Sequence, residues 1–361
     1  MLESALSQLA EAQPLTQEQA YTVFDLIMSG KVSPVRIAAT LSLIQARGAT
    51  VDELTAAARV MREKACHVVP PQDAVVVDTC GTGGDASGTF NISTAAAIVA
   101  AGAGRSYEMV VAKHGNRSVT SRSGSSQVIE TLGVKLEVSG ETLTRCMEEA
   151  GICFCYAPAH HPAMKYAAPV RAELGFRTIF NLLGPLTNPA GASRQVLGVY
   201  HPDLTQPIAT VLKALGSEHA MVVYGQFTTA GDPMCHGGLD ELTTTGPSQI
   251  THLQKGVIKT YTVDPVDLDL PLALSSSLQV DGPAHSAKMI RSVLEGDAGP
   301  ARDIVRLNAA AALVVADLAT DLPAGLEMAT DAIDSGAALA ALDKLVEVTQ
   351  AEGQGSGEFI S

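Results

Sequence analysis

The stretch Val75-Val-Val-Asp-Thr-Cys-Gly-Thr-Gly-Gly-Asp85, followed by Phe90-Asn-Ile-Ser-Thr-Ala-Ala-Ala97, decides the fold of this chain. It predicts a buried strand, a glycine-rich turn and a helix that opens on polar residues. Glycines permit positive φ and let backbone N–H groups approach an anion, and the helix start adds free N–H groups and a positive dipole end. A glycine cluster alone also fits a plain tight turn, but this order favours a phosphate site. Asp85 beside it suits a sugar hydroxyl or a metal ion, so we expect a ribose that carries phosphates.

Strands alternate with helices downstream of residue 74, whereas residues 1–70 show helical spacing of apolar residues only. Such alternation predicts parallel βαβ units and an α/β fold class. Residues 162–183 interrupt the alternation with a helical pattern, so we expect them to return to the first lobe. The expected strands are 74–77, 109–112, 135–138, 152–156, 195–200 and 220–224.

The length of 361 residues favours two lobes over one. We expect a small helical lobe at 1–70, joined by about 162–185. The larger α/β lobe takes 74–161 and 190–349, with a mostly parallel central sheet flanked by helices. Residues 350–361 are expected to form a flexible tail.

The net charge of −14 argues against nucleic acid and anionic membranes as partners. No apolar run of about 18 residues predicts a membrane helix, and the first residues lack the pattern of a signal peptide. The six cysteines show no disulfide or zinc spacing. We therefore expect a cytoplasmic protein with reduced thiols, in which any anionic ligand is held by a local positive site.

Two further motifs suit a phosphorylated ligand. Lys113-His-Gly-Asn-Arg-Ser-Val-Thr-Ser-Arg122 carries three cations and no acid, and follows a strand end, although a solvated basic loop is the alternative. Gly237-Gly-Leu-Asp-Glu241 carries adjacent carboxylates, which alone fit ordinary surface charge. Beside a diphosphate they predict a Mg²⁺ site, because Mg²⁺ is commonly held by one or two carboxylates and ligand phosphates. Arg171 fits either a helix salt bridge or a carboxylate substrate.

Several long motifs in order resemble anthranilate phosphoribosyltransferases over nearly the whole chain. They are Asp78-Thr-Cys-Gly-Thr-Gly-Gly-Asp85, Thr89-Phe-Asn-Ile-Ser-Thr-Ala95, Lys113-His-Gly-Asn-Arg-Ser118, Ala157-Pro-Ala-His-His-Pro-Ala-Met-Lys165, Arg177-Thr-Ile-Phe-Asn-Leu-Leu-Gly-Pro-Leu-Thr-Asn-Pro189 and Gly238-Leu-Asp-Glu241. The resemblance implies transfer of the phosphoribosyl group of phosphoribosyl pyrophosphate (PRPP) to the amine of anthranilate, with release of pyrophosphate, in tryptophan biosynthesis. It also implies Mg²⁺, the two-lobed fold of nucleoside phosphorylases and related phosphoribosyltransferases, and a homodimer through the helical lobes.

The resemblance also implies the site residues. Ser93, Asp240 and Glu241 are expected at the magnesium site, and Gly81, Asn116 and Arg171 at the anthranilate site. No catalytic nucleophile or base is expected; Lys113 and His114 are the nearest candidates. The implied PRPP contacts are Gly81, Gly84, Asp85, Thr89, Asn91, Ile92, Ser93, Thr94, Lys113, His114, Gly115, Asn116, Arg117, Ser118, Val119, Thr120, Ser121 and Ser125.

Two alternatives stay open on the sequence alone. A pyrimidine nucleoside phosphorylase would use free phosphate and need no paired carboxylates, so the acidic pair argues against it. A relative that binds PRPP or nucleic acid without catalysis is disfavoured by the net charge and by the presence of Asn116 and Arg171. Residues 104–109 and 225–236 are longer than the family pattern, and the second segment bears on how the acidic pair is presented.

Overall fold

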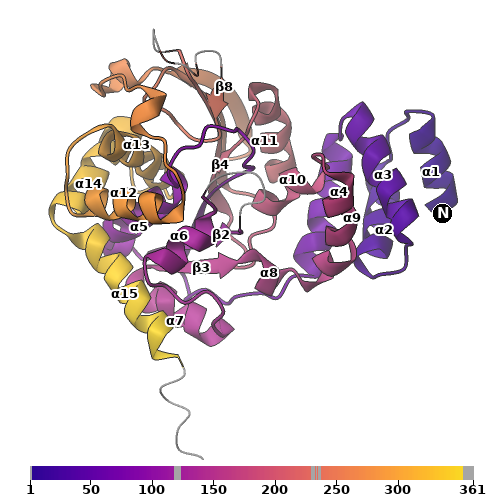
Figure 1. Cartoon of the computed structure of the whole chain (residues 1–361), viewed down its shortest axis with the longest axis horizontal. Coiled ribbons are helices and arrows are strands. Elements are labelled where there is room, and N and C mark those ends of the chain that lie inside the picture. Colours follow the sequence, from indigo (N-terminus) through magenta and orange to yellow (C-terminus); the bar gives the residue numbers. More distant parts are fainter. Residues whose placement is uncertain (1, 118–122, 229–231, 233, 235–236, 353–361) are drawn as a thin grey trace, which may run out of the picture.

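The computed structural model describes residues 2–117, 123–228, 232, 234 and 237–352, and its chain begins with a bundle of helices (Figure 1). Thr16 and Thr50 cap the second and fourth of these helices by accepting a backbone N–H, as their side-chain oxygens favour. The buried Glu53 carboxylate ties the bundle together, because it accepts the Leu15 and Thr50 N–H groups and pairs with Arg47. The helices are α1 (Leu2–Ala10), α2 (Gln17–Met28), α3 (Pro34–Arg47) and α4 (Val51–Glu63).

The larger lobe is built on an eight-stranded sheet with the order β3-β2-β1-β4-β5-β7-β8, and β6 pairs with β5. The five strands from β3 to β5 are parallel, and β6, β7 and β8 are antiparallel to their neighbours. The strands are β1 (Val75–Gly81), β2 (Met109–Gly115), β3 (Ile152–Tyr156), β4 (Arg194–Gly198), β5 (His219–Gln226), β6 (Gly238–Leu239), β7 (Ser248–Gln254) and β8 (Val257–Val263). The predicted fold class, a helical lobe and an α/β lobe with a mostly parallel sheet, is confirmed.

Alternating side chains of the central strands divide the apolar interior into two cores. Val196 and Met221 face a core that includes α5 and α13, whereas Leu197 and Val222 face one shared by α11 and the helical bundle. In Figure 1 the C-terminal helices lie on one side of the sheet and α11 on the other. The helices of this lobe are α5 (Ile92–Gly104), α6 (Ser125–Thr131), α7 (Gly140–Ala150), α11 (Thr205–Ala214), α12 (Pro283–Leu294), α13 (Pro300–Val315), α14 (Leu322–Asp334) and α15 (Ala337–Ala351).

Three short helices after β3 run back to the helical bundle. They are α8 (Ala157–His160), α9 (Ala168–Leu174) and α10 (Phe180–Leu183). The α9 helix contacts α3, α10 contacts α4, and Phe180 packs edge-on against Phe24 with ring centroids 6.0 Å apart. These contacts support the proposed assignment of residues 162–185 to the helical lobe. Short 3-10 turns occupy Arg105–Tyr107, Pro162–Tyr166, Gly184–Leu186, Pro202–Leu204, Pro265–Leu268 and Ser275–Ser277.

Two expectations about secondary structure are corrected, and one hairpin was missed. The predicted strand at 135–138 is wrong: its backbone turns to the end of α15, where Lys135 N–H donates to Thr349 Oγ1 and Ser139 N–H to a Glu352 carboxylate oxygen. The β7–β8 hairpin was not predicted. The expected tail begins too early, because α15 continues to Ala351.

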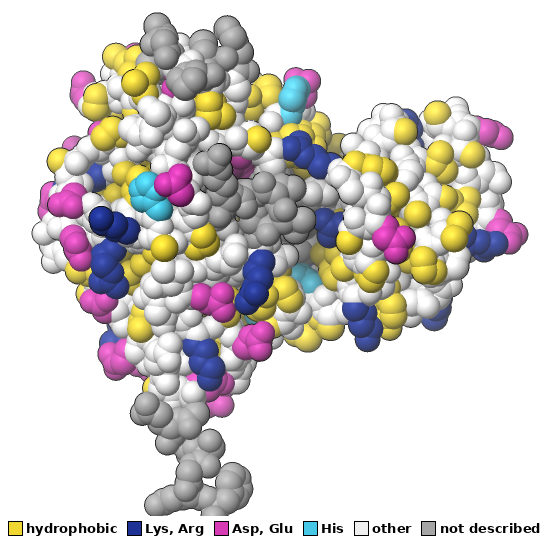
Figure 2. All heavy atoms as spheres, in the orientation of Figure 1, with side chains coloured by type: hydrophobic (Ala, Val, Ile, Leu, Met, Phe, Trp, Pro, Cys, Tyr) yellow, Lys and Arg dark blue, Asp and Glu magenta, His cyan; other side chains and the backbone are white. Residues whose placement is uncertain are grey.

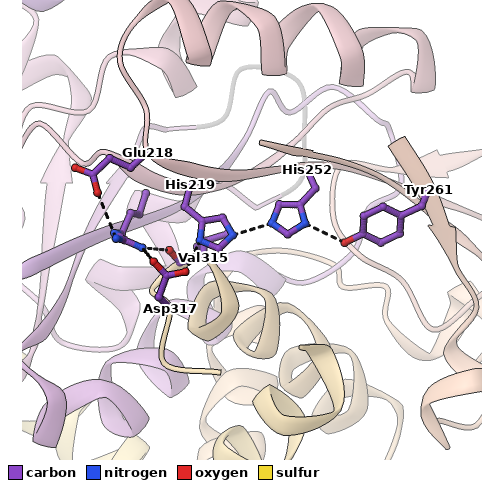
Figure 3. A network of polar contacts seen from close by, with 7 residues as sticks. Glu218, His219, His252, Tyr261, Val315 and Asp317 are labelled. Carbon is purple, nitrogen blue, oxygen red and sulfur yellow. Dashed lines mark hydrogen bonds and ion pairs between the residues drawn. The ribbon is translucent and has the colours of Figure 1, made fainter. Parts of the chain in front are cut away.

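A row of polar side chains joins β5, β7 and β8 to the end of α13 (Figure 3). His219 Nδ1 lies 2.9 Å from Asp317 Oδ1, His219 Nε2 lies 2.7 Å from His252 Nε2, and His252 Nδ1 lies 3.3 Å from Tyr261 Oη. Stacked rings do not approach closer than about 3.5 Å, so the two imidazoles meet edge to edge in a hydrogen bond. The Asp317 carboxylate accepts from His219, which leaves His219 Nε2 to accept from His252, and His252 Nδ1 to accept from the Tyr261 hydroxyl.

We expect this row to make the stability of the fold depend on pH. Burial, with repulsion from His219, lowers the pKa of His252 to about 4, and burial also lowers the pKa of His219. Because these values lie below the ordinary one, the unfolded chain takes up protons first, and the free energy of unfolding falls as pH drops from about 6.5 to about 4. His252→Gln should reduce that fall by about 1 kcal/mol, given partial solvent screening. Urea unfolding at several pH values measures this change, and His67→Gln at an exposed position is the control. Equal pH dependence of the free energy of unfolding in the wild type, His252→Gln and His67→Gln would exclude a contribution from the row.

Candidate active site

The predicted strand, turn and helix are confirmed at the carboxyl edge of the sheet. The β1 strand ends at Gly81, and the turn passes through Gly83 and Gly84 with φ of 65° and 81°, a region that favours glycine. Thr82 anchors the turn to the strand next to it, because its N–H donates to Gly198 O and its Oγ1 accepts from Tyr200 N–H. The α5 helix then begins at Ile92.

The acidic pair lies against this turn and against the start of α5. Asp240 Oδ2 accepts from Gly83 N–H at 2.7 Å, and Glu241 Oε1 accepts from Ser93 N–H at 2.9 Å. The Asp85 carboxylate lies next to them, with Oδ2 3.4 Å from Asp240 N. The tertiary structure therefore brings three predicted acids to the glycine turn.

Two glycines make room for Asp240. A Cβ atom at Gly81 would lie 2.3 Å from Asp240 Oδ2, and one at Gly198 would lie 1.5 Å from Asp240 O. Gly81 and Gly198 face each other in the β1–β4 register, so the two strands open a single gap for the acidic segment. Gly198 was not recognised from the sequence, because its role depends on a contact with a distant loop.

The acids form a partly buried, mutually repelling group that fits a divalent cation. Burial raises the pKa of Asp240 well above its usual range, and the Asp85 and Glu241 charges raise it further. Burial also raises the pKa of Glu241 to about 7, against the opposing effect of Lys113. Within the described ranges, no three His, Cys, Asp or Glu side chains gather to hold a metal on their own. The donors present therefore suit Mg²⁺, which shares its coordination with phosphate oxygens.

Lys113 supplies a buried positive charge beside the acids. Its ammonium donates to Thr79 O at 2.6 Å and to Ser93 Oγ at 3.3 Å. Burial lowers its pKa, whereas the surrounding acids, first of all Asp78, oppose that shift. The Asp78 carboxylate is fully buried and accepts from His114 N–H and from Gln195 Nε2.

Asp78 and Gln195 were not assigned a role from the sequence. The signal for Asp78 was a charge inside an apolar strand, which requires a partner in the fold.

His114 is a neutral group in the same region. Burial lowers its pKa to about 3, and its ring lies 5.1 Å from the ring of His161. The Nε2 atoms of both rings are buried and lack a hydrogen-bond partner among the described residues. Such atoms in a native structure call for a partner, and a bound ligand is one way to supply it.

The predicted residues around the start of α5 divide into two groups. Asn91 faces the loop at Ser123 and the first turn of α12, because its Oδ1 accepts from the hydroxyls of Ser123 at 2.7 Å and Ser286 at 2.8 Å. Thr89 Oγ1 lies 3.1 Å from Ser87 Oγ. The Ile92 and Thr94 side chains are buried in the lobe, which leaves them only main-chain atoms with which to reach a ligand.

The basic motif leaves β2 at Gly115 and reaches α6. Asn116 O accepts from Ser125 Oγ at 3.3 Å, and Asn116 Oδ1 accepts from Arg117 N–H at 2.7 Å. Arg117 Nη2 lies 3.6 Å from Glu130 Oε2, on α6. Four of the predicted PRPP contacts lie outside the described residues: Ser118, Val119, Thr120 and Ser121.

Two arginines extend from the segment that joins the lobes. Arg171, on α9, lies 5.4 Å from the centroid of the Phe180 ring, and burial lowers its pKa. No carboxylate in the described part of the chain forms an ion pair with it, so the helix salt bridge is not observed. Arg177 was not predicted as a site residue; it donates to Gly84 O and lies 4.1 Å from the centroid of the Tyr200 ring. Lys and Arg side chains lie on both sides of the junction between the lobes in Figure 2.

Comparison with known proteins identifies the family. Residues 3–65 match the helical bundle domain, and residues 73–339 the a/b domain, of a glycosyl transferase family. Anthranilate phosphoribosyltransferase of Moorella thermoacetica is 49% identical over 96% of this chain and 98% of its own. The crystal structure of anthranilate phosphoribosyltransferase from Thermus thermophilus matches with a TM-score of 0.86 and 40% identity, over 96% of this chain and 99% of that one.

A second solved structure carries ligands. Anthranilate phosphoribosyltransferase from Saccharomyces cerevisiae, in complex with PRPP and Mg, matches with a TM-score of 0.85 and 26% identity, over 97% of this chain and 98% of that one. Because this match covers nearly the whole of both chains, it includes both lobes. The chain therefore belongs to the glycosyl transferase family with a helical bundle and an a/b domain, among the anthranilate phosphoribosyltransferases.

Proposed function

We propose that this protein is an enzyme that transfers the phosphoribosyl group of PRPP to the amine of anthranilate, giving N-(5-phosphoribosyl)anthranilate and pyrophosphate, in tryptophan biosynthesis. One observation carries the proposal. Asp240 and Glu241 meet the backbone N–H groups of Gly83 and Ser93, with the buried ammonium of Lys113 bonded to Ser93 on the other side. Backbone donors, a cation and paired acids together suit a metal-bound diphosphate better than free phosphate.

The residues that would hold Mg²⁺ are Asp240, Glu241 and the Ser93 hydroxyl. Bound there, the ion would neutralise charge on the departing diphosphate. The structure of the yeast relative in complex with PRPP and Mg supports this choice of ion. The sugar and phosphates would lie along the glycine turn, the start of α5 and the end of β2, where Asp85, Asn91 and Lys113 are found.

The reaction asks for positioning and electrostatic stabilisation more than for a nucleophile. Pyrophosphate leaves C1 of the ribose as positive charge develops on the ring, and the amine of anthranilate attacks in its neutral form. Lys113 and the turn amides stabilise charge on the leaving group, and one such preorganised donor typically contributes about 3 kcal/mol. Arg171 and Asn116 would orient anthranilate, while His114 stays neutral because its pKa is lowered to about 3.

The proposal includes no nucleic acid or membrane partner, and a homodimer formed through the helical lobe. The exposed Val35 at the start of α3 is one apolar side chain that such an interface would cover. Among the described residues, no helix is long and apolar enough to cross a membrane. Sedimentation of the purified protein tests the dimer.

Anthranilate fluorescence tests the proposed reaction. The purified protein should remove the fluorescence when PRPP and Mg²⁺ are both present, and release pyrophosphate in equal amount. Omission of Mg²⁺ should abolish both signals. Failure of this assay, together with phosphate-dependent cleavage of thymidine or uridine, would replace the proposal with a nucleoside phosphorylase.

Arg171→Ala is expected to weaken the use of anthranilate selectively. The half-buried guanidinium has no acidic partner in the described part of the chain, so a substrate carboxylate is its natural counter-charge. Loss of a charged hydrogen bond should raise KM for anthranilate roughly 10- to 100-fold, with KM for PRPP nearly unchanged. Steady-state kinetics with each substrate varied measures this, and Arg59→Ala, on the exposed face of α4, serves as the control. Unchanged constants would remove Arg171 from the anthranilate site.

A further inference from the structure

The two acids of the proposed magnesium site are bonded to the same backbone donors that a phosphate group would need. Asp240 takes the N–H of Gly83 in the glycine turn, and Glu241 takes the N–H of Ser93 in the first turn of α5. Helix starts and glycine turns bind anions through such groups. A carboxylate oxygen on each donor therefore stands where a phosphate oxygen would bind.

The neighbouring donors at the helix start are satisfied differently. Asn91 N–H donates to Ser286 Oγ at 3.0 Å, and Thr94 N–H donates to Asn91 O. Among these N-terminal groups of α5 in the described structure, Ser93 N–H is the one bonded to a charged acceptor. Glu241 is therefore the charged acceptor at the start of α5, and its charge balances the positive end of the helix dipole.

Two glycines and Asp85 also hold this arrangement in place. Gly81 and Gly198 lack the Cβ atoms that would push Asp240 out of the gap, and Asp85 accepts from the Asp240 main chain. Three carboxylates thus surround the donors. An incoming polyanion must displace two of them from the N–H groups of Gly83 and Ser93.

We propose that Asp240 and Glu241 determine whether the metal-bound or the metal-free form of the substrate binds. Their carboxylates compete with phosphate oxygens for the N–H groups of Gly83 and Ser93 until a divalent cation draws the carboxylates away. The site then accepts a diphosphate with its metal ion and rejects the metal-free diphosphate. This inference rests on the proposed function, and adds to it a second role for the acidic pair: exclusion of metal-free ligand.

The test is the binding of inorganic pyrophosphate by calorimetry, with Mg²⁺ or with a chelator. Wild-type protein should bind pyrophosphate at least about ten-fold more tightly with Mg²⁺. Asp240→Ala frees Gly83 N–H and should tighten metal-free binding by about ten-fold, the scale of one charged hydrogen bond. Asp240→Asn keeps an oxygen that can accept from Gly83, so it should tighten metal-free binding less than the alanine variant.

Two further variants distinguish the effect of the hydrogen-bonded carboxylates from a general effect of negative charge. Glu241→Ala frees Ser93 N–H and should also tighten metal-free binding, which keeps the test valid if Asp240→Ala does not fold. Asp85→Asn removes a charge of the same cluster while Gly83 and Ser93 stay bonded, and it should have no more effect than Asp240→Asn. Equal gains from all charge-removing variants, or no gain from either alanine variant, would overturn the inference.

The proposed function fails in a distinguishable way. Wild-type protein that binds no pyrophosphate even with Mg²⁺ would contradict both the function and the inference. Normal Mg²⁺-dependent binding with no change in metal-free binding by the alanine variants would contradict the inference alone.

Discussion

Lys113→Met should lower kcat/KM by roughly 100- to 1000-fold, the usual loss when one preorganised electrostatic donor is removed. Lys113 is 2% exposed, and its ammonium reaches both Thr79 O and Ser93 Oγ. It is the buried cation that faces Asp78 and the acidic pair. Methionine keeps the length and apolar stem of the side chain, so the change removes the charge with little change in packing.

Steady-state kinetics with PRPP and anthranilate checks this expectation. Lys288→Met removes the same charge from an exposed position on α12 and should leave kcat/KM within about two-fold. If both variants retain wild-type kinetics, Lys113 has no part in the stabilisation of the leaving group.

Gly198→Ala should abolish most activity and also destabilise the protein. The new Cβ would lie 1.5 Å from Asp240 O, which is a main-chain atom, so the acidic segment itself must move. Overpacking of this kind typically costs about 1–3 kcal/mol, and we expect the upper end here. Displacement of Asp240 and Glu241 should reduce Mg²⁺-dependent kcat/KM by about 100-fold or more, because small misplacements of site groups have effects of that size.

Urea unfolding and kinetics together measure the two effects. Gly140→Ala is a matched control, because Gly140 begins α7 with open space at its Cβ position. A Gly198→Ala protein with normal stability and normal kinetics would show that Asp240 is not held by this gap.

Local patterns were sufficient for the parts of the fold that short segments determine. Thr16 caps α2 and Pro34 begins α3, and both act within a few residues of the helix ends that they set. The glycine turn was recognised for the same reason. The basic motif at 113–122 and the acidic pair were indicated by their residue types, whereas the roles of single residues came only from the resemblance to a family.

Patterns failed where the partner was distant. The alternating residues at 135–138 looked like a strand, but Lys135 bonds to Thr349, 214 positions away, and not to a sheet neighbour. The β7–β8 hairpin was missed because its strands are partly polar and exposed at the sheet edge, where alternation of apolar residues is weak.

The sequence by itself determined the helical lobe, the parallel strand-helix units and the glycine turn, since these follow from residue spacing and from the conformations that glycine and proline allow. Only the tertiary structure decided how the site is assembled. Asp240 meets Gly83 across 157 positions, and Gln195 meets Asp78 across 117. Such contacts depend on strand order and on gaps left by glycines in neighbouring strands, and the packing of the whole sheet sets both.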